Sequence, residues 1–291
     1  MTNRRTFLGQ AGLASAAMLF APKFLSAKSI NKVGLQLYSL RDYLPKDVKG
    51  VTAKIAEAGY KEVETYGYSQ KGGYWGLDAR DYAEVLTANG LVSPSGHYGF
   101  DQYLSTGGMA DIESYIHAAH TIGQTYIIAP GLNGDLVKTV DGCKAVAEKF
   151  NKAGELLKKE GLKFGYHNHA WEWGKVADTT FYDVLLKETD VNLVKLEMDI
   201  YWVVRAGLDP IAMLEQHPGK FALFHVKDAD KANINLNTEI GKGSIDFKAI
   251  FAKAKAAGVK HFIVEQENFT NIDPYVSIAE SSAYVKNNLS I

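Results

Sequence analysis

The amino-acid sequence predicts an α/β fold, a single (β/α)8 TIM barrel, from three observations. A unit made of an amphipathic helix, a glycine and a strand recurs along the chain. Eight strand-like segments follow one another with helical segments between them. Removal of a predicted 27-residue signal from the 291 residues leaves 264, close to the ~250 residues of such a barrel.

The first 27 residues are predicted to be an export signal outside the barrel. Arg4 and Arg5 precede an apolar run from Ala11 to Phe20, and small residues end near Ala27. This arrangement resembles a twin-arginine signal peptide, and a cleaved signal implies a periplasmic or secreted protein. The apolar run is shorter than the ~20 residues of a membrane span, so no stable membrane insertion is expected; an uncleaved tether is the alternative. The barrel domain is then residues 28–291.

The composition is that of a globular protein, and it favours a small, roughly neutral ligand. Hydrophobic residues make up 46% and charged residues 22% of the chain, and the formal net charge is -1. This balance lacks the excess of Lys and Arg typical of nucleic-acid binding, so no nucleic-acid partner is expected. The single cysteine, Cys143, excludes an internal disulfide, and its helical segment 141–150 predicts a packed side chain.

The recurring unit accounts for five of the eight predicted strands. A helix ends at a small residue and a glycine, and a strand rich in β-branched and aromatic residues begins at once. The glycines are Gly59, Gly90, Gly123, Gly161 and Gly258. The segments that run from each helix end to the following strand end are 55–67, 86–99, 119–131, 157–169 and 254–268.

Three further strands complete the predicted barrel. Residues 32–40 open it, and residues 192–202 and 220–230 occupy the interval between Gly161 and Gly258. Parallel strands need long crossover connections, which the intervening helices supply. A closed barrel is favoured over an open doubly wound sheet, because the turn after the first strand reads SLRDYLPKD and lacks a glycine-rich phosphate loop.

The predicted strand ends are unusually polar, and the active sites of such barrels lie at these ends. The polar residues are Gln36, Tyr38, Glu64, His97, His167, His169, Asp199, His225, Lys227, Glu265, Gln266 and Glu267. Residues two apart on a strand share a face. Three such pairs are therefore predicted to face one cavity: His167 with His169, Glu197 with Asp199, and His225 with Lys227.

A divalent metal ion is the expected partner of this polar set. Buried carboxylates and imidazoles without partners are costly, although any single one could instead be a hydrogen-bonded core or loop residue. Imidazole nitrogens with carboxylate oxygens suit Zn²⁺, Mn²⁺, Fe²⁺ or Co²⁺ better than Mg²⁺ or Ca²⁺. Aromatic residues near the same ends offer flat faces for a sugar ring, or alternatively cap the barrel core; they are Tyr38, Tyr66, Tyr98, Trp171, Trp173 and Trp202.

Several segments resemble one family of barrels. The segments GLQLYSLRD, YHNHAWEW, LEMDIYWVVRAGLDP, FHVKDAD, GKGSIDF and FIVEQEN are similar to the xylose isomerase-like superfamily, specifically its sugar phosphate isomerase/epimerase group. The resemblance implies one divalent metal ion held by Asp199, His225 and Glu265. A glutamate on strand five is the usual fourth ligand; here His167 replaces it within HNH, with His169 in reserve. Trp202 stands where many relatives carry a histidine.

The resemblance also implies removal of a proton next to a sugar carbonyl. Glu265 is expected to be the base, and His167 takes the place of the second base that epimerases use. Lys227 is expected to stabilise a developing oxyanion and Glu172 to act as a mobile acid, although either could be purely structural. The residues expected to contact the substrate are Gln36, Tyr38, Glu64, His97, His169 and Trp202.

The expected function is an exported, metal-dependent sugar isomerase or epimerase. Epimerisation uses two bases, whereas isomerisation on one face or β-elimination needs only one. The alternatives are a lyase or hydrolase of oxidised (3-keto) glycosides and a catalytically inactive carbohydrate-binding barrel. The expected partner is a small sugar or keto-sugar, free rather than phosphorylated because of the export signal, and the sequence is compatible with a homo-oligomer.

Overall fold

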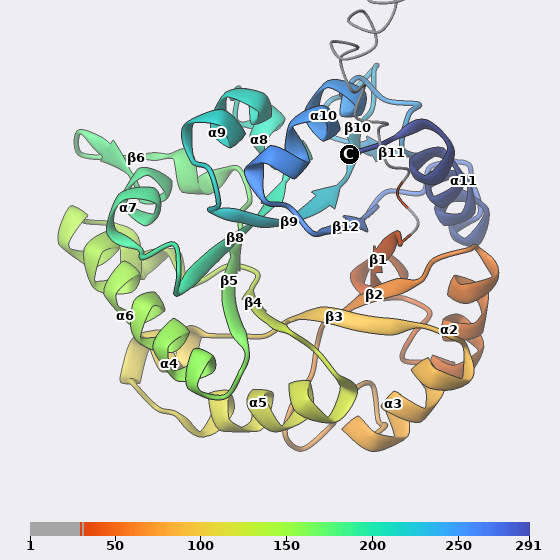
Figure 1. Ribbon diagram of the computed structural model, residues 1–291, viewed down its shortest axis with the longest axis horizontal. Helices are drawn as coiled ribbons and strands as arrows, with labels where there is room; N and C mark the ends of the chain where they lie inside the picture. Colours follow the sequence, from red (N-terminus) through yellow and green to blue (C-terminus); the bar gives the residue numbers. More distant parts are fainter. Residues whose placement is uncertain (1–29, 31) are drawn as a thin grey trace, which may run out of the picture.

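The computed structural model describes residues 30 and 32–291, so the predicted export signal lies outside the described residues. Eight parallel strands form a closed barrel, which confirms the predicted fold (Figure 1). Around the barrel they are β1 (Gly34–Gln36), β2 (Glu62–Thr65), β3 (Val92–His97), β4 (Tyr126–Ala129), β5 (Lys163–His167), β8 (Val194–Asp199), β9 (Phe221–Val226) and β12 (His261–Val264), and β12 pairs with β1.

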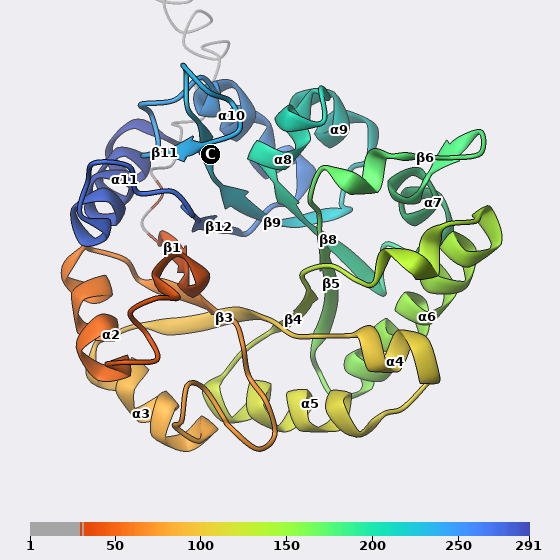
Figure 2. The same cartoon turned by 180° about the vertical axis from the view of Figure 1, so that it is seen from behind.

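Helices cover the outside of the barrel, as both views show (Figures 1 and 2). They are α2 (Val48–Glu57), α3 (Ala79–Ala88), α4 (Asp101–Thr106), α5 (Ala110–Ile122), α6 (Val140–Lys159), α7 (Phe181–Glu188), α8 (Ile200–Arg205), α9 (Pro210–Gln216), α10 (Phe247–Ala257) and α11 (Pro274–Asn288). Three short 3-10 helices, η2 (Leu37–Leu40), η3 (Gly134–Val137) and η4 (Trp171–Trp173), lie in the connections. So do two antiparallel pairs, β6 (Lys175–Val176) with β7 (Thr179–Thr180), and β10 (Asp228–Ala229) with β11 (Asn237–Thr238).

The recurring glycines end helices, as the sequence predicts. Gly123 follows α5 with φ 80° and Gly258 follows α10 with φ 93°, both in the left-handed region. A side chain with a Cβ is disfavoured there, and glycine lets the chain turn directly into the next strand. Each such turn leads into a strand that runs in the same direction as the others, so all eight carboxyl ends lie on one side of the barrel.

The core has two parts. A large apolar cluster fills the space between strands and helices, and it includes the fully buried Cys143, which packs in α6 as predicted. A small separate cluster consists of Tyr126 and Ile128 of β4 and Ala222 and Leu223 of β9. Tyr126 and Ile128 lie two apart and share a face, and Leu223 shares a face of β9 with His225 of the site, which is the face toward the barrel interior. Part of the barrel interior is therefore apolar. No helix of the described residues is both long and apolar enough to cross a membrane.

Candidate active site

The polar side chains at the carboxyl ends of the strands form two overlapping groups. In the upper group, His167, Asp199, His225 and Glu265 each place one potential ligand atom within 4.8 Å of the others. In the deeper group, His97, His167, Glu197 and His225 do the same. His167 and His225 belong to both groups, so these two imidazoles join the two layers.

The upper group fits a divalent metal ion. The His225 Nδ1 atom lies 3.1 Å from Glu265 Oε2, and the His167 Nε2 atom lies 3.9 Å from Asp199 Oδ2. The other carboxylate oxygen of Asp199, Oδ1, accepts a hydrogen bond from the Trp202 backbone N–H at the start of α8. Asp199 Oδ2 is buried and has no hydrogen-bond partner among the described residues. Lys227 Nζ lies 3.9 Å from this oxygen, beyond hydrogen-bond distance, so Oδ2 still has a lone pair available for a bound cation.

The deeper group contains the carboxylate of Glu197, and a second carboxylate, Glu64, lies against it; together they form the deeper layer. Glu197 Oε2 lies 2.8 Å from His97 Nε2, 3.2 Å from His167 Nδ1 and 3.3 Å from His225 Nε2. Glu64 Oε2 lies 2.6 Å from His225 Nε2 and accepts a hydrogen bond from Gln36 Nε2 at 2.7 Å. Both glutamates are fully buried. Glu197 and Glu64 therefore contact the nitrogens of His167 and His225 that face away from the upper group.

Burial and close charges shift the acid-base equilibria of these groups. Burial would lower the pKa of His97, but Glu64 and Glu197 outweigh it and raise the pKa to about 9. Burial and the neighbouring charge of Glu64 raise the pKa of Glu197 to about 7. Burial raises the pKa of Asp199 to about 6, although Lys227 acts against it. Burial is the main cause of both raised carboxylate pKa values, and the neighbouring histidines and Lys227 act against it.

Lys227 links the upper group to a further glutamate, Glu267. The Lys227 Nζ atom lies 3.2 Å from Glu265 Oε2 and also contacts Glu267 Oε1. Burial would lower the pKa of this lysine, but Glu265, Asp199 and Glu267 hold it well above its usual range. The lysine and His225 in turn overcome burial and keep the pKa of Glu265 well below its usual range. Glu265 is therefore an ionised carboxylate at neutral pH.

A cavity of about 390 Å³ lies over these groups. It is lined by Tyr38, Tyr66, Gly67, His97, Tyr98, Gly99, Pro130, His167, His169, Trp202, Glu265 and Glu267. Tyr38 packs edge-on against Tyr66, with ring centres 5.2 Å apart, and the two rings form part of the wall. The volume and the aromatic lining suit one small polar molecule with apolar faces, such as a sugar.

Comparisons with known proteins identify the fold family. A family model described as "Xylose isomerase-like TIM barrel" matches residues 52–287. The chain belongs to the xylose isomerase-like TIM barrel family. The xylose isomerase-like barrels are a family of enzymes, which agrees with a catalytic reading of the polar strand ends.

Named relatives of this xylose isomerase-like barrel include lyases. An inosose dehydratase of Clostridium perfringens is 32% identical over 149 residues, 45% of this chain and 49% of that protein. An inosose dehydratase of Geobacillus thermodenitrificans is 29% identical over 154 residues, 47% of this chain and 51% of that protein. The chain spans about half the length of the curated relatives it matches.

Solved structures of the family match more of the chain. A sugar phosphate isomerase/epimerase of Parabacteroides distasonis has a TM-score of 0.76 at 29% identity, over 92% of this chain and 97% of that chain. A D-allulose 3-epimerase of Methylomonas sp. has a TM-score of 0.67 at 13% identity, over 91% of this chain and 100% of that chain. The second likeness shows the fold alone.

The structure of this xylose isomerase-like barrel brings most of the predicted site residues together. Tyr38, His97, His167, His169, Trp202 and Glu265 line the cavity, and Asp199, His225 and Lys227 lie buried beside it. Gln36 and Glu64 are fully buried and do not line the cavity, so their predicted contact with substrate stays a prediction. Both side chains instead form hydrogen bonds in the deeper layer, Gln36 to Glu64 and Glu64 to His225.

Glu172 does not act at the cavity. Its Oε1 accepts hydrogen bonds from the Tyr166 hydroxyl and the His169 backbone N–H, both at 2.9 Å, and Oε2 also lies 2.9 Å from that N–H. The side chain is fully buried. These contacts replace the predicted role of a mobile acid with an anchor that fixes the turn after β5.

Two of the predicted aromatic residues also point elsewhere. Trp171 stacks on Phe181 of α7, and Trp173 packs against Tyr182, with ring centres 5.9 and 4.4 Å apart. Neither lines the cavity. Both rings lie in η4, where they attach the loop after β5 to the outer helix.

Two functional candidates were missing from the predicted site. Glu197 was predicted to face the cavity with Asp199 but was given no role, and it contacts three imidazoles. Glu267 follows the last strand and lines the cavity. The two-residue alternation with Asp199 and Glu265 was the available signal for both.

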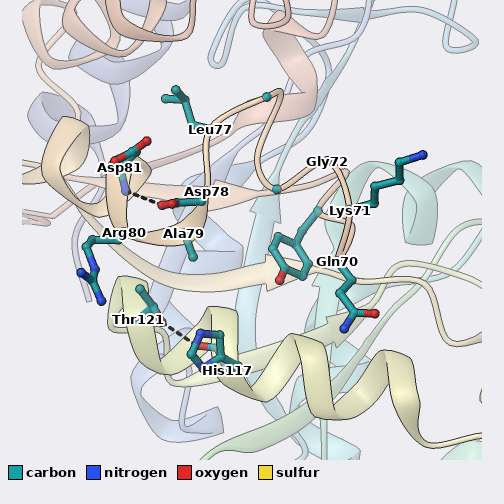
Figure 3. Close-up of a pocket in the computed structure, with 13 residues that line it drawn as sticks. Gln70, Lys71, Gly72, Leu77, Asp78, Ala79, Arg80, Asp81, His117 and Thr121 are labelled. Atoms are coloured by element: carbon teal, nitrogen blue, oxygen red, sulfur yellow. Dashed lines mark hydrogen bonds between the residues drawn. The ribbon is translucent and has the colours of Figure 1, made fainter.

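A second, larger pocket of about 610 Å³ lies away from the strand ends (Figure 3). The loop before α3 and the outer face of α5 form it, and its charged residues, Lys71, Asp78, Arg80 and Asp81, are solvent-exposed. Asp78 caps α3 by accepting from the Asp81 N–H, as Figure 3 shows. None of the clustered imidazoles or buried carboxylates reaches this pocket. Larger volume alone does not make it the active site.

Proposed function

We propose that this barrel is a metal-dependent enzyme that removes the proton next to a carbonyl of a sugar or keto-sugar. The observation that carries the proposal is the upper group, four buried ligand-type side chains with an unpartnered Asp199 oxygen, directly beneath a sugar-sized cavity. His167, Asp199, His225 and Glu265 are the proposed ligands. Zn²⁺, Mn²⁺, Fe²⁺ and Co²⁺ are the ions that this nitrogen and oxygen donor set suits.

A bound divalent ion would polarise the substrate carbonyl and so acidify the adjacent carbon. The residues of the chain do the rest. Glu265 reaches the cavity surface as a carboxylate, and we assign it the removal of the carbon-bound proton. Lys227, 3.2 Å from Glu265, places a second positive charge next to the position where negative charge develops on oxygen.

The distribution of side chains favours β-elimination from a keto-sugar. Glu265 and Glu267 follow β12, whereas His97 on β3 and His167 and His169 at the end of β5 come from strands three places away on either side. The cavity is therefore lined by carboxylates from one side of the barrel and imidazoles from the other, and these converge where His167 and Glu265 meet. The His169 side chain lines the cavity, while its buried Nδ1 lies 3.8 Å from Glu172 Oε1.

The proposed elimination needs one base and one acid. Glu265 accepts the proton, and the electron pair of the broken C–H bond forms the enolate. The enolate then expels the oxygen on the next carbon, which leaves as water after taking a proton from His169 or a neighbouring imidazole. The product is an unsaturated ketone. The inosose dehydratase relatives, whose name describes loss of water from a keto-polyol, support this reading.

Isomerisation on one face is the second candidate, and the similarity to the Parabacteroides distasonis sugar phosphate isomerase/epimerase favours it. It uses the same first proton transfer, after which Glu265 returns the proton to the neighbouring carbon. We propose an unphosphorylated substrate in either case. Two glutamates line the cavity, and no Lys or Arg of the described residues does, so a phosphate group away from the metal would meet no side-chain cation there.

We also propose that the enzyme works in the periplasm or outside the cell. The twin-arginine pattern at Arg4 and Arg5 supports this location. Fusion of residues 1–27 to a reporter protein tests it. Export that depends on both arginines supports the proposal, and retention of the reporter inside the cell contradicts it.

The function is tested with the metal-loaded full chain and a panel of inososes and keto-sugars in D₂O. Elimination gives an unsaturated ketone detected by ultraviolet absorbance, and isomerisation gives a deuterated product without that absorbance. Chelation of the metal should abolish both. A panel in which no carbon-bound proton exchanges would contradict the proposal and favour a carbohydrate-binding barrel.

A further inference from the structure

We infer that Glu197 and Glu64 are positioning residues for the metal site, which fix the tautomer and orientation of His167 and His225. The inference rests on the proposed metal site and adds a specific assignment of atoms. The metal would be bound by Nε2 of His167 and Nδ1 of His225, because the opposite nitrogens face Glu197 and Glu64. The carboxylate next to His225 Nδ1, Glu265, is itself a proposed metal ligand.

The contacts divide each imidazole into two ends. His167 points Nε2 toward Asp199 at 3.9 Å and Nδ1 toward Glu197 Oε2 at 3.2 Å. His225 points Nδ1 toward Glu265 Oε2 at 3.1 Å and Nε2 toward Glu64 Oε2 at 2.6 Å. Each ring therefore has one nitrogen in the upper group and one nitrogen in the deeper layer.

The hydrogen-bond partners of each ring then determine its tautomer. A neutral imidazole has one N–H donor and one lone pair, and a ligand to a metal must offer the lone pair. A carboxylate accepts hydrogen bonds, so Glu197 and Glu64 select the N–H for the deep nitrogens. The lone pairs are left on the nitrogens that face Asp199 and Glu265. Buried carboxylates behind histidine ligands typically orient the rings and increase their basicity.

A second metal in the deeper layer is the competing interpretation, and the shared residues argue against it. Both groups need His167 and His225. To serve two metals, each ring would have to lose both of its protons, and two bridging imidazolates in one site would be required. One metal with a carboxylate layer behind it needs no such deprotonation.

The placement of Glu197 also accounts for the imidazole on strand five. His167 and Glu197 are register partners on neighbouring strands β5 and β8. A carboxylate directly beside His167 can hold that ring, whereas a second carboxylate at position 167 would meet the Glu197 charge. The imidazole at position 167 is therefore compatible with the buried Glu197 carboxylate beside it.

Glu197→Gln and Glu64→Gln in the full chain test the inference, with Zn²⁺ or Co²⁺ affinity measured by competition with a chelator. Each should bind one ion per chain with roughly 10- to 100-fold lower affinity, and Glu197→Asp should recover part of the loss. Glu62→Gln is the matched control. Glu62 also holds an imidazole, His261, at 2.9 Å, but on the far end of the same barrel, so its affinity should not change.

A measurement on the unaltered protein keeps the inference testable if a variant does not fold. In the Co²⁺-loaded chain, the deep N–H protons of His167 and His225 should give two shifted, solvent-exchangeable proton resonances. Their absence, or a stoichiometry of two ions per chain, would overturn the inference. So would unchanged affinity in both glutamine variants. Failure of the unaltered chain to bind any of these ions would instead sink the proposed metal site itself.

Discussion

His167 and Glu197 sit side by side on β5 and β8, with the imidazole Nδ1 3.2 Å from the carboxylate Oε2. The ring also reaches toward Asp199 through its other nitrogen. The carboxylate of Glu197 therefore lies next to the proposed metal ligand His167 and is not itself a proposed ligand. This pairing makes the effect of a substitution at either position depend on the other.

The variant His167→Glu should be destabilised, because it places a second carboxylate next to the buried Glu197. The double variant His167→Glu/Glu197→Gln should recover stability, with a favourable coupling of about 1–3 kcal/mol. Urea unfolding of the four proteins of the cycle, all metal-free, measures the coupling. Additive effects of the two substitutions would show that the residues do not act as a pair.

Glu265→Gln should abolish exchange of the carbon-bound proton while leaving the fold intact, because an amide fills the space but cannot accept a proton. Asp199→Asn should mainly weaken metal binding, since the unpartnered Oδ2 is the proposed ligand atom. Deuterium incorporation and metal affinity are measured on both variants. Undiminished exchange in Glu265→Gln would remove this residue from the role of base.

The barrel was predictable from the sequence because its signals are local. Gly123 and Gly258 mark helix ends by a backbone conformation that glycine favours, and the strands follow them directly. Asp199, His225 and Glu265 lie close together because the parallel strands of a closed barrel bring their carboxyl ends together.

The division of these side chains into cavity and support was not predictable. Glu64 and His97 both end strands, yet only His97 lines the cavity. The depth of a side chain within the barrel depends on strand register and tilt. The alternation of residues along a single strand does not predict either one. Glu172 shows the same limit, because its partner is a backbone N–H formed by a turn that the sequence does not specify.

Glu172→Ala should lower activity through the position of His169, since it leaves the His169 N–H and the Tyr166 hydroxyl without their acceptor. We expect a loss of stability of about 2–4 kcal/mol for two buried donors. Glu172→Gln keeps one acceptor oxygen and should lose less. Thermal unfolding and turnover are measured together. A stable Glu172→Ala protein without turnover would instead support a direct catalytic role.

The stability of the barrel should fall below pH 4.5 through Glu239. Burial would raise the pKa of this carboxyl, but hydrogen bonds from Gln266 and Ser277, with help from Lys242, lower it from 4.5 to about 2. The carboxylate contribution is therefore complete above pH 4.5 and disappears as the pH falls toward 2, on the order of 2 kcal/mol after solvent screening.

Glu239→Gln should accordingly flatten the dependence of unfolding free energy on pH between 5 and about 2. Glu148→Gln is the control, because Glu148 forms only an exposed pair with Lys152. Urea unfolding across this pH range compares the two variants with the unaltered protein. Equal slopes in the Glu239 variant and the unaltered protein would contradict the assignment.

Asp228→Ala should destabilise the loop that leads into α10. Asp228 is fully buried, and its carboxylate accepts from the backbone N–H groups of Gly241, Gly243 and Ile245 at 2.9, 3.0 and 3.1 Å. Alanine leaves three donors without that acceptor, so we expect a loss of about 3–5 kcal/mol in unfolding free energy. Asp209→Ala is the control, because that exposed aspartate caps α9 through the Ile211 N–H alone, a role worth about 1 kcal/mol. If the two variants lose the same stability, solvent must satisfy the loop donors, and Asp228 is not what holds the loop beside Lys227.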